Sequence, residues 1–311
     1  MRPLAAAQAT SARRLASERS QTAMLRATSA TLVVLVLALV GLGSVVHSTG
    51  ASLACPDWPL CGGEVFPEMV GGVEYEHSHR ILAAIVALLS VVVAAQTWRQ
   101  RAEDLRRAQL AAAAVGLVLV QAGLGAMTVL MRLPPAVSTA HYAVSMLFFL
   151  ACAEVARRTF FRDFGADRLA RSRAIVTGLV FAQLVLGALV RHLGAGYACG
   201  RDPWLCAPLL SSAPTLPAVQ IAHRVLGVVL VFALFWLARR AARTGARVHG
   251  GILVNLVVAQ IALGLVTIGS GISIPIVTAH AVVGAVLLLM TVTLGRLSSP
   301  LRLAAKQSAP A

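Results

Sequence analysis

Charged residues are scarce in this chain. They make up only 13% of the 311 residues, against roughly 25% in typical soluble domains, whereas 58% of the residues are hydrophobic. The mean hydropathy of +0.80 excludes an ordinary soluble domain. The alternation of apolar and polar residues that marks the strands of a membrane β-barrel is absent as well. This composition indicates a helical protein embedded in lipid.

Long apolar runs take the place of the missing charges. A helix needs about 20 residues to cross roughly 30 Å of hydrocarbon, because each residue adds about 1.5 Å. Backbone groups find no water inside lipid, and a helix satisfies their hydrogen bonds internally. We therefore expect an all-α integral membrane protein with eight transmembrane helices. They are predicted at about 28–47, 78–98, 108–131, 137–156, 173–192, 218–238, 249–270 and 276–295.

Acidic residues are also few, since 12 Asp and Glu stand against 27 Lys and Arg, for a net charge of +15. The arginines collect in the N-terminal tail and in every second connection between the expected spans. No RNA- or DNA-binding motif accompanies them, so the excess indicates membrane topology and not nucleic-acid binding. The positive-inside rule places both termini in the cytoplasm. We expect an uncleaved first span and a bacterial inner-membrane location.

Cysteine is rare, and no Cys-x-x-Cys motif occurs among the five. Four of them form close pairs in the two longer outward loops, Cys55 with Cys61 and Cys199 with Cys206. The outer side of a bacterial inner membrane is oxidising, so each pair predicts a disulfide, with either a loop-shaping or a redox role. A zinc site is disfavoured by the spacing and by the intervening prolines. Cys152, inside an expected span, is interpreted as a packing residue.

Histidines recur along the chain in a regular order. His79 and His223 are 144 residues apart and each follows a cysteine pair, while His141 and His280 are 139 residues apart. All four fall near the outer ends of the second, fourth, sixth and eighth expected spans. A single histidine there could merely hydrogen-bond a neighbouring helix. Two pairs at one depth instead predict bis-histidine ligation of haem iron, because helix bundles hold such cofactors between facing imidazoles.

Arginines stand beside these histidines. Arg80 directly follows His79, and Arg224 directly follows His223. Guanidinium groups pair with carboxylates, so both arginines are candidates for contact with haem propionates that point outward. Arg132 and Arg191, at the outer ends of the third and fifth spans, suit either propionates or lipid headgroups.

The two repeats differ at one position close to the histidines. Glu76 lies three residues before His79, whereas Gln220 lies three residues before His223. Residues three apart share one helix face, so the Glu76 carboxylate is expected near the first haem, where it could relay protons. The alternative is an acid that only complements the helix dipole. We therefore predict that the N-terminal half is catalytic. His77, which has no counterpart in the second half, is expected at the surface.

With these residues in place, the chain resembles the bacterial haem A synthase (CtaA/Cox15) family over roughly residues 28–297. The resemblance lies in Thr49-Gly50, Cys55-Pro-Asp-Trp-Pro-Leu-Cys61 and Glu76-His-Ser-His-Arg80, with matching elements in the second half. The chain departs from the family at His47-Ser48, where an arginine is frequent, and in the less compact loop between Cys199 and Cys206. These departures affect the expected propionate contacts and loop shape, but not the four histidines.

The resemblance implies two four-helix bundles related by a pseudo-twofold axis along the membrane normal. It implies haem o as substrate at His79 and His141, haem b as cofactor at His223 and His280, and oxidation of the C8 methyl of haem o to a formyl group. The expected partners are a haem o-forming farnesyltransferase, a membrane electron donor such as quinone, lipid, and a second copy of the chain. The expected segments are a tail (1–27), an N-terminal half (28–160), a linker (161–172), a C-terminal half (173–297) and a tail (298–311).

Three other functions fit part of the pattern. A dihaem b-type cytochrome linked to quinone explains four histidines equally well, but leaves Glu76 and the difference between the halves without a role. A thiol–quinone oxidoreductase would use the loop cysteines and leave the histidines without a purpose. A transporter with parallel repeats fits the topology, but neither half has a broken helix with a polar midplane site.

Overall fold

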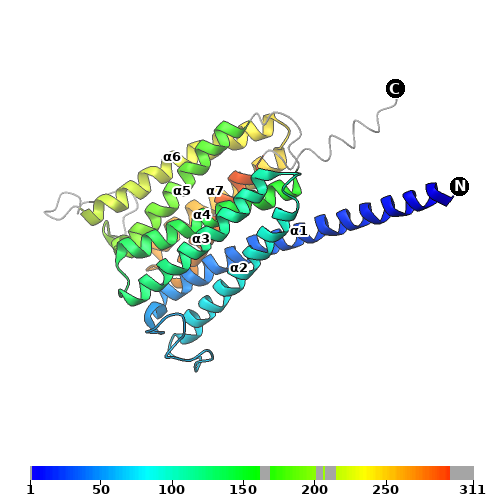
Figure 1. Cartoon of the computed structure of the whole chain (residues 1–311). Coiled ribbons are helices and arrows are strands. Elements are labelled where there is room, and N and C mark those ends of the chain that lie inside the picture. Colours follow the sequence, from blue (N-terminus) through cyan, green and yellow to red (C-terminus); the bar gives the residue numbers. More distant parts are fainter. Residues whose placement is uncertain (1, 162–168, 201–205, 207–214, 295–311) are drawn as a thin grey trace.

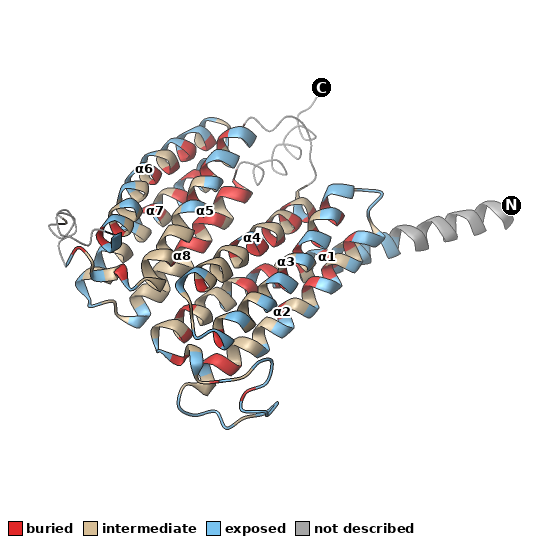
Figure 2. Ribbon diagram, turned by 60° about the vertical axis from the view of Figure 1, so that its left-hand side comes forward, coloured by how far each residue is buried: buried red, intermediate tan, exposed pale blue. Residues whose placement is uncertain are grey.

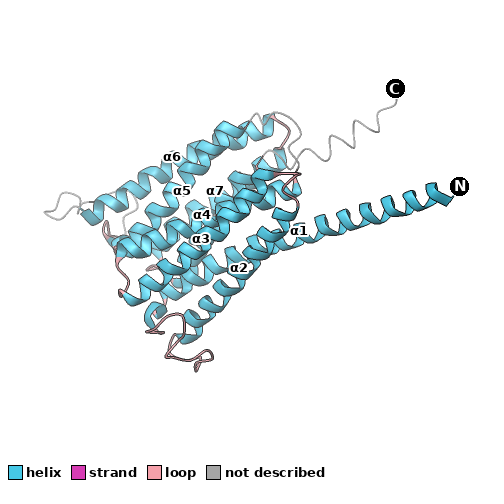
Figure 3. Ribbon diagram, viewed as in Figure 1, coloured by secondary structure: helices cyan, strands magenta, loops and turns pink. Residues whose placement is uncertain are grey.

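The computed structural model describes residues 2–161, 169–200, 206 and 215–294. Within these ranges the chain forms eight α-helices and no strand, apart from an isolated bridge between Cys61 and Glu64 (Figure 3). The helices are α1 (Arg2–Ser48), α2 (Val73–Arg99), α3 (Leu105–Leu130), α4 (Pro135–Phe160), α5 (Ala170–His192), α6 (Thr215–Arg243), α7 (Arg247–Gly269) and α8 (Ile274–Thr293). The expected tail 298–311 and most of the loop between Cys199 and Cys206 lie outside the described residues.

The eight expected spans are confirmed, because each described helix contains a window long and apolar enough to cross a membrane. The chain is therefore a multi-pass membrane protein. The largest difference is at the start, where the expected tail 1–27 continues α1 back to Arg2 and projects beyond the other helices (Figure 1). This segment is rich in Ala and Arg, which favour helix, and its one proline lies in the first turn.

The helices pack in two groups of four. In the first group α1 contacts α2 and α4, and α3 lies between α2 and α4; α5 to α8 repeat this pattern. Contacts of α1 and α4 with α8, and of α4 with α5, join the groups (Figure 1). These contacts agree with two four-helix halves, and the pseudo-twofold relation between them stays a prediction.

The turns that end α3 and α7 repeat in the backbone as well as in the sequence. Leu133 and Ile272, 139 residues apart, both adopt a positive φ that is unusual for residues with a side chain, 61° and 58°. The N–H of Leu133 donates to the carbonyl of Thr128 at 2.7 Å, and the N–H of Ile272 donates to that of Thr267 at 2.8 Å. Each turn therefore supplies a hydrogen-bond donor to a carbonyl near the end of its helix. The next helix then begins with a proline at N1 or N2.

Apolar side chains lie on both the inside and the outside of the helix groups. Buried residues line the helix faces that meet one another, and exposed residues lie on the outer faces (Figure 2). Large apolar side chains among the exposed ones include Leu88, Leu119, Phe232 and Val248. A water-soluble protein rarely exposes so much apolar surface, whereas lipid tails solvate it well.

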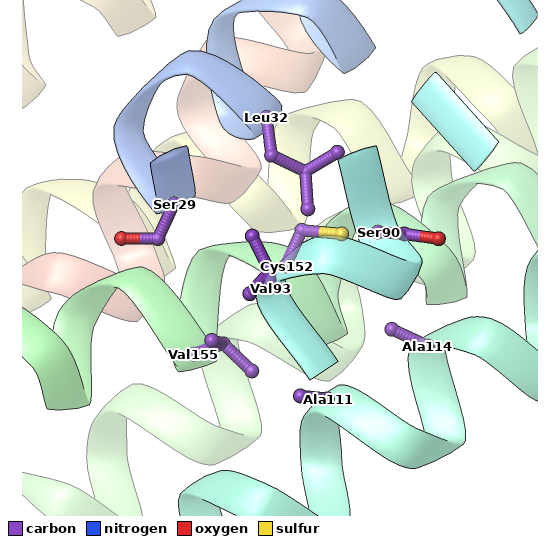
Figure 4. Close-up of a pocket in the computed structure, with 8 residues that line it drawn as sticks. All are labelled: Ser29, Leu32, Ser90, Val93, Ala111, Ala114, Cys152 and Val155. Carbon is purple, nitrogen blue, oxygen red and sulfur yellow. The ribbon is translucent and has the colours of Figure 1, made fainter. Parts of the chain in front are cut away.

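A small cavity interrupts the packing of the first group. Its volume is about 10 Å³, enough for roughly one water molecule. All four helices of the group contribute to its wall (Figure 4). The lining residues are Ser29, Leu32, Ser90, Val93, Ala111, Ala114, Cys152 and Val155. Most of them are small, so the four helices enclose space that their side chains do not fill.

Candidate functional site

Each histidine of the N-terminal half lies against a glycine of a neighbouring helix, and we call that residue a notch glycine. A Cβ on Gly43 of α1 would lie 3.0 Å from Cε1 of His79 of α2, and a Cβ on Gly125 of α3 would lie 3.2 Å from Cε1 of His141 of α4. Any larger residue would push the ring aside. The two imidazoles are also within electrostatic reach of each other. Helices α2 and α4 thus bring His79 and His141 together inside one helix group.

The C-terminal half repeats this arrangement. A Cβ on Gly187 of α5 would lie 3.0 Å from Cε1 of His223, and one on Gly264 of α7 would lie 3.2 Å from Cε1 of His280. His223 and His280 also interact electrostatically. The structure therefore places two of the four histidines in each helix group, in agreement with their matching offsets. Their role as haem ligands stays a prediction.

Glutamine side chains accompany three of the four histidines. Each lies four residues before the notch glycine, and its Nε2 faces the Nε2 of the histidine, at 3.1 Å for Gln121 and His141. The distance is 3.4 Å for Gln183 and His223 and for Gln260 and His280. A donor at Nε2 fixes the tautomer whose lone pair is on that nitrogen, which is the form that binds a metal. Leu39 occupies the corresponding position beside His79.

The donor set fits haem. In all four histidines Nδ1 is buried, and within the described part of the chain it has no hydrogen-bond partner. Each imidazole lies in an apolar helix group that also holds the second histidine of its half, as bis-histidine ligation of a planar cofactor requires. In the tautomer that keeps its proton on Nδ1, Nε2 is the nitrogen that can bind iron.

Glu76 lies in the first turns of α2 and is 4% exposed. Its Oε2 accepts the backbone N–H of Cys55 at 2.8 Å, and its Oε1 accepts a guanidinium N–H of Arg80 at 2.5 Å. Gln220 repeats half of this arrangement, because its Oε1 accepts the backbone N–H of Cys199 at 2.8 Å. The two residues therefore hold their cysteine loops alike, and they differ in charge. A catalytic role of Glu76 stays a prediction.

Arg80 forms several hydrogen bonds with the loop from Cys55 to Cys61, here called the first cysteine loop. Besides Glu76, its guanidinium donates to the carbonyls of Asp57 at 2.7 Å and of Cys55 at 3.1 Å, and also to that of Leu60. This geometry identifies Arg80 as a clamp on the loop, a role that the sequence did not suggest. Its contact with a haem propionate, and that of Arg224 in α6, stay predictions.

Asp57 closes the same loop from the other side. Its carboxylate accepts the backbone N–H groups of Gly62 at 2.6 Å and of Gly63 at 2.8 Å. The hydrogen bond from Gly63 and the nearby Arg80 charge hold the pKa of Asp57 below its usual value of 3.8. The loop is therefore fixed by side chains at both ends and by a disulfide.

Both predicted disulfides are present, between Cys55 and Cys61 and between Cys199 and Cys206. Cys152 is buried and is the free cysteine of the described residues, in agreement with a packing role. The expectation for His77 was wrong, since this side chain is only 6% exposed. The first cysteine loop folds back over the start of α2 and covers it, a contact that a helical pattern does not reveal.

Arg191 joins the two halves where α1 and α5 end. Its guanidinium donates from α5 to Oγ of Ser44 at 3.0 Å and to the carbonyl of Ser44 at 2.7 Å, and it also contacts Oγ of Ser48 in α1. The rings of His47 and His192 meet edge to face beside it, with centroids 5.1 Å apart. The His47-Ser48 departure from the family thus lies at the seam between the halves.

The glycine notches and the glutamines were missed by the sequence reasoning, although a signal was present. Gln-x-x-x-Gly occurs at Gln121, Gln183 and Gln260, always on a helix that directly precedes a histidine helix. The first and last of these are 139 residues apart, the same offset as for His141 and His280. Extending the repeat comparison to the neighbouring helices would have found them.

Comparison with known proteins agrees with this geometry. The model of the COX15-CtaA family, described as cytochrome oxidase assembly protein, matches residues 73–292, which contain all four paired histidines. A protein of Symbiobacterium thermophilum named heme A synthase is 35% identical, over 77% of this chain and 84% of its own length. Proteins of the same name from Exiguobacterium sibiricum and Bacillus licheniformis are 31% and 27% identical, over 66% and 81% of this chain and 73% and 88% of their own lengths.

Proposed function

Because the chain belongs to the COX15-CtaA family of cytochrome oxidase assembly proteins, we propose that it is a haem A synthase. The reaction oxidises the C8 methyl group of haem o to a formyl group, and the product serves terminal oxidase assembly. The observation that carries the proposal is the pair of buried imidazole sites, one in each half, within the segment that the family matches.

The two halves hold different haems in this proposal. His79 and His141 hold the substrate haem o, and His223 and His280 hold haem b. When bound, haem b supplies one-electron redox chemistry. The notch glycines would leave room for the histidine imidazoles that hold these haems, and the apolar helix groups would exclude water from them.

Glu76 is the acid–base residue in this proposal. On the porphyrin rim the C8 methyl neighbours a propionate, so outward propionates bring that methyl toward the outer end of α2. Glu76 lies there, one turn from His79, and can take up a proton released as the methyl is oxidised. Arg80 contacts its carboxylate directly and keeps it oriented. Gln220 cannot accept a proton in this way, which supports placing the chemistry in the N-terminal half.

The surroundings of the reaction follow from its chemistry. A farnesyltransferase that forms haem o would supply the substrate, and a membrane quinone would exchange electrons with the protein; a second copy of the chain and lipid are further expected partners. The placement of the arginines supports a bacterial cell membrane location with both termini in the cytoplasm. Arg80 and Arg224 remain the proposed propionate contacts.

Haem analysis tests the proposal. The protein is co-expressed with a haem o-forming farnesyltransferase, and the extracted haems are separated by chromatography. Accumulation of haem a, absent when His79 is replaced by alanine, supports the synthase. Haem b alone, with reversible redox spectra of the purified protein, would instead support the dihaem electron carrier.

A further inference from the structure

His77 has no role in the haem sites, yet it is buried. Only 6% of it is exposed, and within the described residues neither ring nitrogen has a hydrogen-bond partner. Burying an imidazole in this state is unfavourable, because both nitrogens lose their water. An unsatisfied buried group of this kind points to a ligand or an ion.

The nearest chemistry beside His77 is the first disulfide. One ring nitrogen of His77 and the sulfurs of Cys55 and Cys61 all lie within 4.8 Å of one another. The two cysteines are 0% and 4% exposed, so the whole cluster is shielded from water. Two sulfurs and an imidazole nitrogen are the ligand types that Zn²⁺ and Cu⁺ prefer.

The cluster is held in place from several directions. His77 lies in the second turn of α2, while Cys55 and Cys61 belong to the loop that Glu76 and Arg80 fix through backbone hydrogen bonds. Two sulfurs on a tetrahedral zinc lie about 3.8 Å apart, given bonds of ~2.3 Å. Once the sulfur–sulfur bond is broken, the three ligands need only small shifts to reach that geometry.

The second cysteine loop serves as an internal comparison. The residue 144 positions after His77 is Ile221, which offers no ligand atom, although Cys199 and Cys206 also form a disulfide. A histidine is therefore not needed to shape a loop of this kind. The third ligand is specific to the N-terminal half.

We propose that, once the Cys55–Cys61 disulfide is reduced, Cys55, Cys61 and His77 bind a thiophilic d¹⁰ cation, Zn²⁺ or Cu⁺. An external dithiol transfers two electrons and two protons to the disulfide and becomes a disulfide itself. The two cysteine thiols then release their protons to solvent as the metal binds both sulfurs. The loop thus has two alternative closures, a disulfide and a metal, and only the second includes His77.

Metal titration of the full-length protein in detergent tests this proposal. Cys199 and Cys206 are replaced by serine, which leaves one disulfide, and thiol labelling verifies its reduction by a phosphine. Co²⁺ then serves as a spectroscopic probe that Zn²⁺ displaces, and a separate titration delivers Cu⁺ from a chromophoric chelator. We expect one equivalent of metal with a thiolate-to-cobalt charge-transfer band, and no such band before reduction.

The matched variant is His77→Ile, which copies the second half. We expect it to lower the affinity for Zn²⁺ or Cu⁺ at least ~100-fold, since even residues behind the ligands can contribute that much. Haem binding by the variant verifies its fold. Equal affinity in both proteins, a band before reduction, a disulfide that resists reduction in the folded protein, or no band after verified reduction would each overturn the proposal. Because the readout is metal and not haem a, the outcome is separate from that for the proposed function.

Discussion

The N-terminal and C-terminal halves share one arrangement of helices but differ in the side chains that fill the space between them. In each half, four residues form one layer between the helices. Two of them lie eleven positions after the two histidines, and the other two lie eleven positions before the two notch glycines. Eleven positions are about three helical turns, so each layer residue shares a helix face with its histidine or glycine. The N-terminal layer is Leu32, Ser90, Ala114 and Cys152, and the C-terminal layer is Val176, Leu234, Leu253 and Thr291. The first has nine side-chain heavy atoms and the second fourteen. The cavity lies in the layer with fewer atoms.

The difference bears on the proposal that the C-terminal half holds the permanent haem and the N-terminal half the substrate haem. In the C-terminal half Leu253 and Thr291 are fully buried, and Gly250 packs so closely that a Cβ on it would lie 2.8 Å from the carbonyl oxygen of Ala238. The N-terminal layer borders a cavity of about 10 Å³, and its half lacks the glutamine that would face His79. A tightly packed core resists deformation, and a loosely packed one yields more easily. The layer beside the cavity lies in the same half as Glu76.

Removing one proposed haem ligand from each half is expected to have the largest effect. His79→Ala should abolish haem a formation while the haem b spectrum of the purified protein persists, because the cofactor pair is intact. His223→Ala should instead remove that spectrum, since metal sites depend on every strong ligand. Haem extraction and reduced-minus-oxidised spectra measure both. Loss of the resident haem b signal in the His79 variant alone would reverse the assignment of the halves.

Exchanging the acid and the amide comes next. Glu76→Gln keeps an acceptor for the N–H of Cys55 but cannot carry a proton, so haem a formation should fall roughly 100- to 10,000-fold with haem o still bound. Gln220→Glu, the reverse change in the other half, should leave the rate within a factor of about three. Turnover of reconstituted protein supplied with haem o measures both. Unchanged turnover in Glu76→Gln would mean that Glu76 only holds its cysteine loop in place, as Gln220 does.

The packing difference itself can be tested by truncation. Leu253→Ala should destabilise the protein by about 2 kcal/mol, near the low end for buried leucines, because lipid already offers an apolar surrounding and only packing is lost. Cys152→Ala, at the edge of the existing cavity, should cost less than ~1 kcal/mol. Unfolding of the two variants in detergent gives the comparison. Equal losses would mean that the two cores are packed alike.

The smallest expected effect is on the pH response of the first cysteine loop. The pKa of Asp57 is lowered in the folded protein, chiefly by the N–H of Gly63. Its contribution to loop stability is therefore complete above the ordinary value of 3.8 and is lost as the pH falls through the lower folded value. Hydrogen exchange at Gly62 and Gly63, corrected for intrinsic rates, should rise only below about pH 3.8. In Asp57→Asn exchange should lack this step, and a step in that variant would assign the response to another group.

Sequence alone could predict the features that depend on local pattern. The spans follow from apolar length, and the pairing of the histidines follows from their matching offsets and depths. The side-chain environment could not be predicted in this way. Arg80 binds loop carbonyls because the first cysteine loop folds back over α2, and the same fold buries His77. The helical extension of α1 was also missed, because the high charge of its residues suggested a tail although most of them favour helix.

The bond between Arg191 and α1 has a consequence for how the protein is made. Ser44 precedes its partner by 147 residues, and Ser48 by 143. During synthesis α1 is made before α5, so the C-terminal end of α1 has to wait for α5 before this contact can form. The first bundle therefore completes its outer edge only after translation has passed well into the second, and a chain that stops after α4 would leave that edge unfinished.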